Sequence, residues 1–318
     1  MTRLVDHGTA AVLTVSLLGA VSGCATLAGS WDYGLPKDHA SKADRLWHIV
    51  FPLSVAAADS CVFKREDTYG FLLNEDSPAN GEAADPARVL VRFVHAQLPA
   101  GRAGMAIGDA IVMINGDPVT FPRAEPVSEQ IQRLTRARIQ PLTLGLRRGA
   151  VEREVNLWSV PSCRMNVVLI TSPMVNALSD GSNIVLTTGL LDFVRSPDQL
   201  AWVIAHELGH HALEHSENKR LQLMLNQFLG STVGEKPVAI RQVELERQAD
   251  VFAANLTTRA GFDLREARRL LGWMQVLQKP EENQLTQSHP PTQERLDALD
   301  KMISELEKGK TTQSFRVE

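Results

Sequence analysis

The stretch from Ser196 to His210 reads SPDQLAWVIAHELGH, and it decides the fold of the second half of the chain. Ser196, Pro197 and Gln199 are typical of a helix start, with serine as the N-cap and proline in the first turn. Apolar residues follow at helical spacing, so one side of this helix is expected to be buried. His206 and His210 are four residues apart and share a face. Two imidazoles in this arrangement can bind one zinc ion.

A zinc site needs a third protein ligand, and the later stretch 244–250, ELERQAD, offers two acidic residues on one helical face. We expect Glu246 to complete a site for one Zn²⁺ per chain. Asp250 is expected to accept a hydrogen bond from a ligand imidazole and fix its tautomer. Glu207, beside the first histidine, is the expected general base on a zinc-bound water.

Three other polar residues near these motifs are not expected to bind the metal. Glu244 lies on another side of its helix from Glu246, so it is interpreted as a solvated charge. His211 is expected to point away from the site. His215 is expected at the surface, although its position leaves an approach to the rim of the site open.

Residues 161–300 resemble the HtpX, Oma and CAAX-prenyl-protease type of zinc metallopeptidases, peptidase family M48. The resemblance rests on Asn176-Ala177 with the strand-like run 183–191, on the HExxH and ExxAD motifs, and on the late motif HPPTQER at 289–295. It implies an α+β fold with a mainly helical, gluzincin-like zincin domain. It also implies that the segment 176–181, with Asn176 and Ala177, binds substrate backbone. His289 is implied to be an oxyanion donor or a gate, with Arg295 as its support.

Residues 62–160 change character, with short β-rich runs and glycine turns. The region resembles a PDZ domain through Ala103-Gly104-Met105 and through GDAIVMINGDPV at 108–119. Tyr69, Gly70, Phe71 and Leu72 resemble the loop whose backbone N–H groups bind a peptide C-terminus. The resemblance implies an inserted PDZ-like domain that binds peptide C-termini. The alternative is a PDZ fold used only as a spacer or lid.

The N-terminus has the pattern of a bacterial lipoprotein signal. Thirteen mostly apolar or small residues, 9–21, are too few for a spanning helix but suit a secretory signal. The run ends in VSGC at 21–24, which resembles a lipobox and predicts lipidation of Cys24. Alanine after this cysteine favours the outer membrane of a Gram-negative cell, facing the periplasm. An ordinary signal peptide with an incidental cysteine is the alternative.

The other two cysteines, Cys61 and Cys163, are predicted to form a disulfide in an oxidising periplasm, with two buried thiols as the alternative. They flank the PDZ-like segment, so the bridge would join both ends of an insertion. The expected organisation is a signal peptide at 1–23, a tether at 24–37, a helix at 38–61 that packs on the peptidase domain, the PDZ-like domain at 62–160, the peptidase domain at 161–308 and a polar tail at 309–318.

Composition limits the partners. The 318 residues carry a net charge of −4 and are 44% hydrophobic, which is ordinary for a globular protein. Because the chain has no net positive charge, nucleic acid is not expected as a partner. The membrane is expected to be contacted only through the lipid anchor. The favoured hypothesis is a periplasmic zinc endopeptidase that hydrolyses misfolded or misassembled envelope proteins. The alternative is a latent or non-catalytic PDZ-containing lipoprotein that acts as a chaperone or adaptor.

Overall fold

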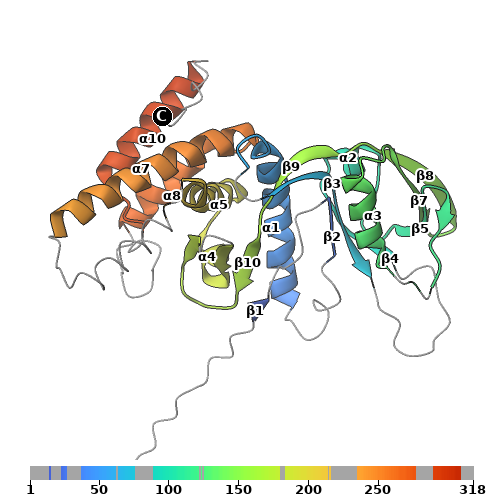
Figure 1. The fold of residues 1–318 in the computed structure, drawn as a ribbon. Helices are drawn as coiled ribbons and strands as arrows, with labels where there is room; N and C mark the ends of the chain where they lie inside the picture. The colour runs from blue at the N-terminus through green and yellow to red at the C-terminus, as the bar shows by residue number, and fades with distance from the viewer. Residues whose placement is uncertain are drawn as a thin grey trace, which may run out of the picture.

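A long helix, α1 (Lys37–Ala56), separates a mainly helical unit from a β-rich unit (Figure 1). The computed structural model describes residues 14–15, 23–26, 37–61, 64–75, 89–121, 123, 125–179, 183–213, 215, 235–276 and 289–308. Two hydrophobic cores exist in this part of the chain, one in each unit. The predicted α+β class, with a β-rich insertion in a mainly helical domain, is confirmed.

The helical unit is built around α5 (Pro197–Ala212), most of whose residues are buried. The helix begins as the sequence predicts, because the Ser196 side chain caps the N–H of Gln199. Among the described residues it is accompanied by the helices α4 (Thr188–Phe193), α7 (Glu235–Arg259), α8 (Leu264–Val276) and α10 (Gln293–Glu307). The helix α7 packs along α5, and this contact forms the site described below.

A small sheet adjoins these helices in the order β1-β10-β12-β11. Its strands are β1 (Thr14–Val15), β10 (Val167–Ile170), β11 (Ala177–Ser179) and β12 (Ile184–Thr187). Strand β10 is parallel to β12, whereas β11 is antiparallel to β12 and lies at the edge. The edge position leaves one side of β11 without a strand partner among the described residues.

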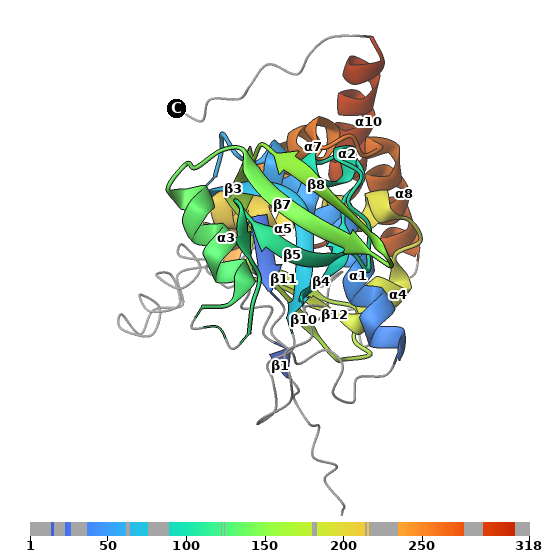
Figure 2. The same ribbon diagram turned by 90° about the vertical axis from the view of Figure 1, so that its right-hand side faces the viewer.

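The β-rich unit is a curled sheet with two helices. Its strands are β2 (Gly23–Thr26), β3 (Lys64–Glu75), β4 (Val89–Val94), β5 (Ala110–Ile114), β6 (Asp117–Pro118), β7 (Leu142–Arg148), β8 (Val151–Leu157) and β9 (Val160–Arg164). The helices are α2 (Pro99–Arg102) and α3 (Val127–Arg136), and α3 lies beside the sheet in the turned view (Figure 2). Asn115 and Gly116, between β5 and β6, both have positive φ, as a tight hairpin turn requires.

The chain enters and leaves the β-rich unit on paired strands. The beginning of β3 is antiparallel to β9, from Lys64 opposite Arg164 to Thr68 opposite Val160. At this pair, Cys61, which precedes β3, and Cys163, which lies on β9, form a disulfide with their Cα atoms 5.1 Å apart. The bridge and the strand pair therefore tie both ends of the insertion to one place.

The helix α1 packs on both units. Its apolar side chains Leu46, Ile49 and Leu53, with Ala57 just after its end, are buried in the core of the helical unit, in agreement with the predicted packing on this domain. On the side of the β-rich unit, the Phe51 ring stacks on Phe93 of β4 with centroids 5.6 Å apart. Pro52 is accommodated inside the helix.

Some sequence expectations differ from the structure or fall outside it. The helix predicted at 197–228 ends at Ala212, and most of the following segment lies outside the described residues. The motif segment 183–191 contains β12 and then α4, and the Thr187 side chain caps the N-terminus of α4. The polar tail and most of the predicted signal peptide and tether also lie outside the described residues.

Candidate metal centre

Helix α5 presents its two histidines to one point. The Nε2 atoms of His206 and His210 are 3.0 Å apart, as expected for residues one helical turn apart. Both rings are buried, and Glu207 is buried beside them. The helix thus offers two imidazole nitrogens and an adjacent carboxylate in one place.

Helix α7 supplies the acidic partners from across the helix contact. The carboxylate of Glu246 lies 3.2 Å from His206 Nε2 and 3.4 Å from His210 Nε2. One turn later, Asp250 Oδ1 lies 3.0 Å from the other nitrogen of His206, Nδ1. The two acidic residues therefore have different places: Glu246 faces the metal-binding nitrogens, and Asp250 orients one of the rings.

His289 completes the cluster. Its Nδ1 lies 2.9 Å from Glu246 Oε2 and 3.2 Å from His206 Nε2, and its Nε2 lies 3.3 Å from Glu207 Oε1. Sequence reasoning assigned His289 an oxyanion or gating role and missed it as a fourth donor. Its only sequence signal was the late HPP motif.

The donor set fits zinc. Four buried residues, His206, His210, Glu246 and His289, offer one ligand atom each, and these atoms all lie within 4.8 Å of one another. Imidazole nitrogens and a carboxylate oxygen are ligands that zinc prefers. The predicted ligands are thus brought together with one further histidine.

Arg295, at the start of α10, clamps Asp250. Its Nε and Nη2 atoms donate to the two carboxylate oxygens, both at 2.7 Å, and its Nη1 donates to the carbonyl of Pro290 at 3.0 Å. Arg295 was expected to support an oxyanion donor. The structure instead places its strongest contacts on Asp250, so it ties the segment after His289 to α7.

The two α5 histidines have different electrostatic environments. Burial opposes protonation of His206, but hydrogen bonds to Asp250 and Glu246 outweigh this and raise its pKa to about 9. Burial lowers the pKa of His210 to about 4, against the opposing effect of Glu246. Burial alone would raise the pKa of Glu246, yet its histidine partners hold it well below the usual range. The carboxylate is therefore kept ionised, as a ligand must be.

The expectation that His215 lies at the surface is wrong. The residue is 2% exposed, and its Nδ1 lies 3.0 Å from His210 Nδ1. The surface prediction rests on one helix that continues past the HExxH motif, but α5 ends at Ala212 with Leu213 as its C-cap. Glu244 is half-exposed and pairs with Arg247, in agreement with its interpretation as a solvated charge.

The residues predicted to bind peptides lie at β11 of the small sheet and at β3 of the β-rich unit. Ala177 is buried on β11, and Asn176 precedes it with its backbone held by the Thr187 hydroxyl. In the β-rich unit, Tyr69, Phe71 and Leu72 are buried on β3, while Gly70 has φ of +81°. Cys24 lies on β2, which pairs in parallel with β3 beside this glycine.

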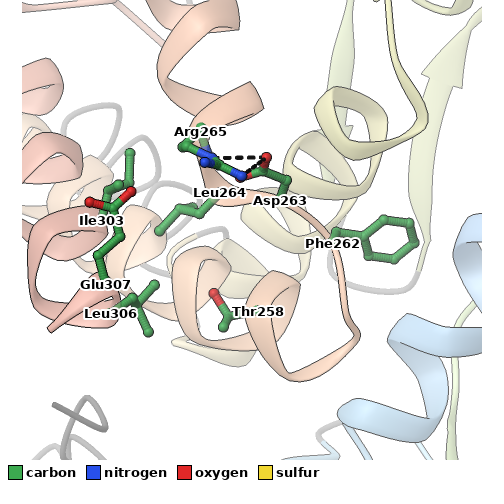
Figure 3. Close-up of a pocket in the computed structure, with 8 residues that line it drawn as sticks. All are labelled: Thr258, Phe262, Asp263, Leu264, Arg265, Ile303, Leu306 and Glu307. Atoms are coloured by element: carbon green, nitrogen blue, oxygen red, sulfur yellow. Dashed lines mark hydrogen bonds and ion pairs between the residues drawn. The ribbon is translucent and has the colours of Figure 1, made fainter. Parts of the chain in front are cut away.

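The structure also contains a pocket of about 280 Å³ among α7, α8 and α10 (Figure 3). Its walls include Phe262, Leu264, Ile303 and Leu306, and an ion pair between Arg265 and Asp263 lies at its edge. None of the clustered donors lines it. The pocket is therefore separate from the candidate metal centre.

Two family models match this part of the chain. Residues 148–244 match "Peptidase family M48", and residues 198–314 match "Peptidase U49". The first match contains the HExxH motif, and the second also contains Glu246, Asp250 and His289. The C-terminal part of the chain is thus similar to peptidase family M48. This match indicates a metallopeptidase, and the buried donor cluster agrees with it.

Other comparisons add little to this M48 assignment. A solved structure of the HtrA3 PDZ domain bound to a phage-derived ligand (FGRWV) is 20% identical, with a TM-score of 0.24, and covers 31% of this chain and 88% of that chain. No curated protein matches the chain. Among the described helices, none combines the length and the apolar character that crossing a bilayer requires.

Proposed function

We propose that the protein is a zinc-dependent endopeptidase. The observation that carries the proposal is the buried cluster of His206, His210 and Glu246 with the Glu207 carboxylate beside it. Zinc bound by these ligands supplies Lewis-acid activation of water and of the scissile carbonyl. Proton transfer and the orientation of the ligands are the roles of the protein's own side chains.

Glu207 has the position of the proton carrier. Its carboxylate takes a proton from the attacking water and delivers it to the leaving amine. Asp250, held by Arg295, keeps His206 oriented with Nε2 toward the cluster. Glu246, the acidic ligand, remains ionised beside the clustered histidines.

The substrate class follows from strand β11. It is an edge strand next to α5, and Leu178 on it is 41% exposed. An extended peptide can add to such an edge through backbone hydrogen bonds that are largely independent of sequence. This supports unfolded or misassembled polypeptides as substrates.

We place the protein in the periplasm, anchored through lipidated Cys24 to the outer membrane of a Gram-negative bacterium. The lipobox-like sequence and the Cys61–Cys163 disulfide support this location, because disulfides persist in oxidising compartments. Cys24→Ala should abolish labelling by a radioactive fatty acid and release the protein from the membrane fraction. Unchanged labelling would refute the anchor.

The β-rich unit is proposed to bind peptide C-termini. Gly70 provides the positive φ that a carboxylate-binding turn requires, and α3 packs beside β3. The pairing of the chain's own β2 with this edge of β3 supports the proposal that a peptide strand can add there. Gly70→Trp should abolish binding of C-terminal peptides.

A latent enzyme is the second candidate, and His289 favours it. The residue lies within reach of both Glu207 and Glu246, where the open position of a catalytic zinc site is needed. If His289 closes the site, His289→Ala should raise peptidase activity. If His289 donates to the oxyanion, the same variant should lose activity.

Cleavage of one protein in its native and unfolded states tests the proposed function. The protein should digest the unfolded form and spare the native form, and a chelator should abolish digestion. Equal protection of an unfolded client by wild type and Glu207→Gln, without cleavage by either, would instead support the chaperone-like alternative.

A further inference from the structure

His215 is a buried histidine that the catalytic roles above do not use. It follows the end of α5, and its ring lies against the ring of His210, with centroids 5.1 Å apart and an angle of 70° between the planes. The two Nδ1 atoms are 3.0 Å apart. This contact is on the side of His210 that faces away from the cluster of donors.

The polarity of this contact follows from the metal site. Two ring nitrogens at this distance form a hydrogen bond only if one of them carries the proton. The Nε2 of His210 faces His206 and Glu246 and must be unprotonated to bind a metal. The proton of His210 is therefore on Nδ1, and His215 Nδ1 is the acceptor.

The next contacts agree with this direction. With Nδ1 as acceptor, neutral His215 carries its proton on Nε2, which lies 3.3 Å from Gln248 Oε1. The Gln248 amide donates in turn to Glu244 Oε1 at 2.9 Å. In this series of hydrogen bonds, from Glu244 through Gln248 and His215 to His210, each donor thus faces an acceptor.

We propose that His215 is a positioning residue that holds His210 in the tautomer and orientation required for metal binding. The proposal rests on the proposed zinc site and extends it. The two histidines of α5 then have different outer partners: a carboxylate for His206 and a neutral imidazole for His210. Outer partners of this kind typically change metal affinity 10–100-fold when they are removed.

Two substitutions separate positioning from packing. His215→Phe keeps a ring but removes the acceptor, whereas His215→Asn places an amide oxygen near the position of Nδ1. His211→Phe is the matched control, because His211 is half-buried on the same helix and is not one of the four clustered donors. Zinc affinity of the full chain is measured by competition with a chromophoric chelator at fixed pH, and the Co²⁺ absorption spectrum reports ligand geometry.

The expected result is a loss of about 10–100-fold in zinc affinity for His215→Phe, with recovery in His215→Asn to within about threefold of wild type. His211→Phe should match wild type. Equal affinities of His215→Phe and wild type would overturn the proposal, as would equal losses in the Phe and Asn variants. A wild type that binds no zinc would overturn the proposed function itself, which keeps the two failures distinct.

Nitrogen NMR of the wild type provides a readout that does not depend on folding of a variant. In the zinc-loaded protein, His210 should be protonated at Nδ1 and His215 at Nε2. A proton on Nδ1 of His215 would overturn the proposal.

Discussion

Replacing Gly209 by alanine is expected to loosen the metal centre, because α5 touches α7 at this glycine. A β-carbon at Gly209 would lie 3.2 Å from the Cα and the carbonyl oxygen of Ala249 and 3.2 Å from Cδ1 of Phe252. Nonbonded heavy atoms pack best at about 3.5–4.0 Å, so the helices would have to separate by about 0.3–0.8 Å.

This separation acts directly on the donors. His206 and His210 lie on α5 and Glu246 lies on α7, so the distance between these ligands would grow by a similar amount. Metal–ligand distances tolerate only about 0.2 Å. We therefore expect zinc affinity to fall at least tenfold. The free energy of unfolding should change by only about 0–2 kcal/mol. Overpacking costs about 1–3 kcal/mol, and the better helix propensity of alanine offsets about 1 kcal/mol of this cost.

Gly272→Ala in α8 is the matched control. There the added β-carbon would meet only the end of the Arg268 side chain, which can move away. This variant should be more stable by about 1 kcal/mol and bind zinc like wild type. Affinity is measured by chelator competition and stability by urea unfolding. The reasoning is refuted if Gly209→Ala binds zinc within twofold of wild type.

Three further predictions concern stability. Replacing Cys61 and Cys163 by alanine should lower the free energy of unfolding by about 4–5 kcal/mol, because the bridge spans 102 residues; a loss below about 1 kcal/mol in urea unfolding would contradict this. Burial alone would raise the pKa of Asp109, but its arginine partners lower it below the usual value. The ionised carboxylate therefore stabilises the fold at pH values above its unfolded-state pKa. This stabilisation is lost as the pH falls through the folded-state pKa. Asp109→Asn should therefore cost about 1–3 kcal/mol at pH 7 and much less in strong acid, and an equal cost at both pH values would count against the ion pair. Arg295→Met leaves the buried Asp250 carboxylate without its clamp and should cost about 3–5 kcal/mol, partly recovered by adding Asp250→Asn; an unchanged denaturation midpoint would show that the clamp is unimportant.

The sequence predicts much of the helical unit, because its signals are local. Ser196 caps α5, the apolar stripe of α1 is buried, and the histidines of HExxH meet Glu246 across the contact of α5 and α7. These features depend on helical spacing and capping, which a short stretch of sequence contains.

The features that the sequence could not predict depend on where the chain turns. His215 is buried beyond the end of α5 at Ala212, and no proline or glycine marks that end. His289 reaches the cluster through the fold of a loop, and Arg295 reaches Asp250 because α10 packs on α7. Such contacts join residues 43–83 positions apart, and helical periodicity says nothing about them.

Zinc content and casein cleavage, measured together on wild type and Glu207→Gln, test the central claim most directly. The expected result is about one zinc per chain in both proteins and cleavage only in wild type, because the substitution keeps the proposed ligands and removes the proton carrier. Equal cleavage by both proteins, or a purified wild type that neither contains nor takes up zinc, would contradict the account.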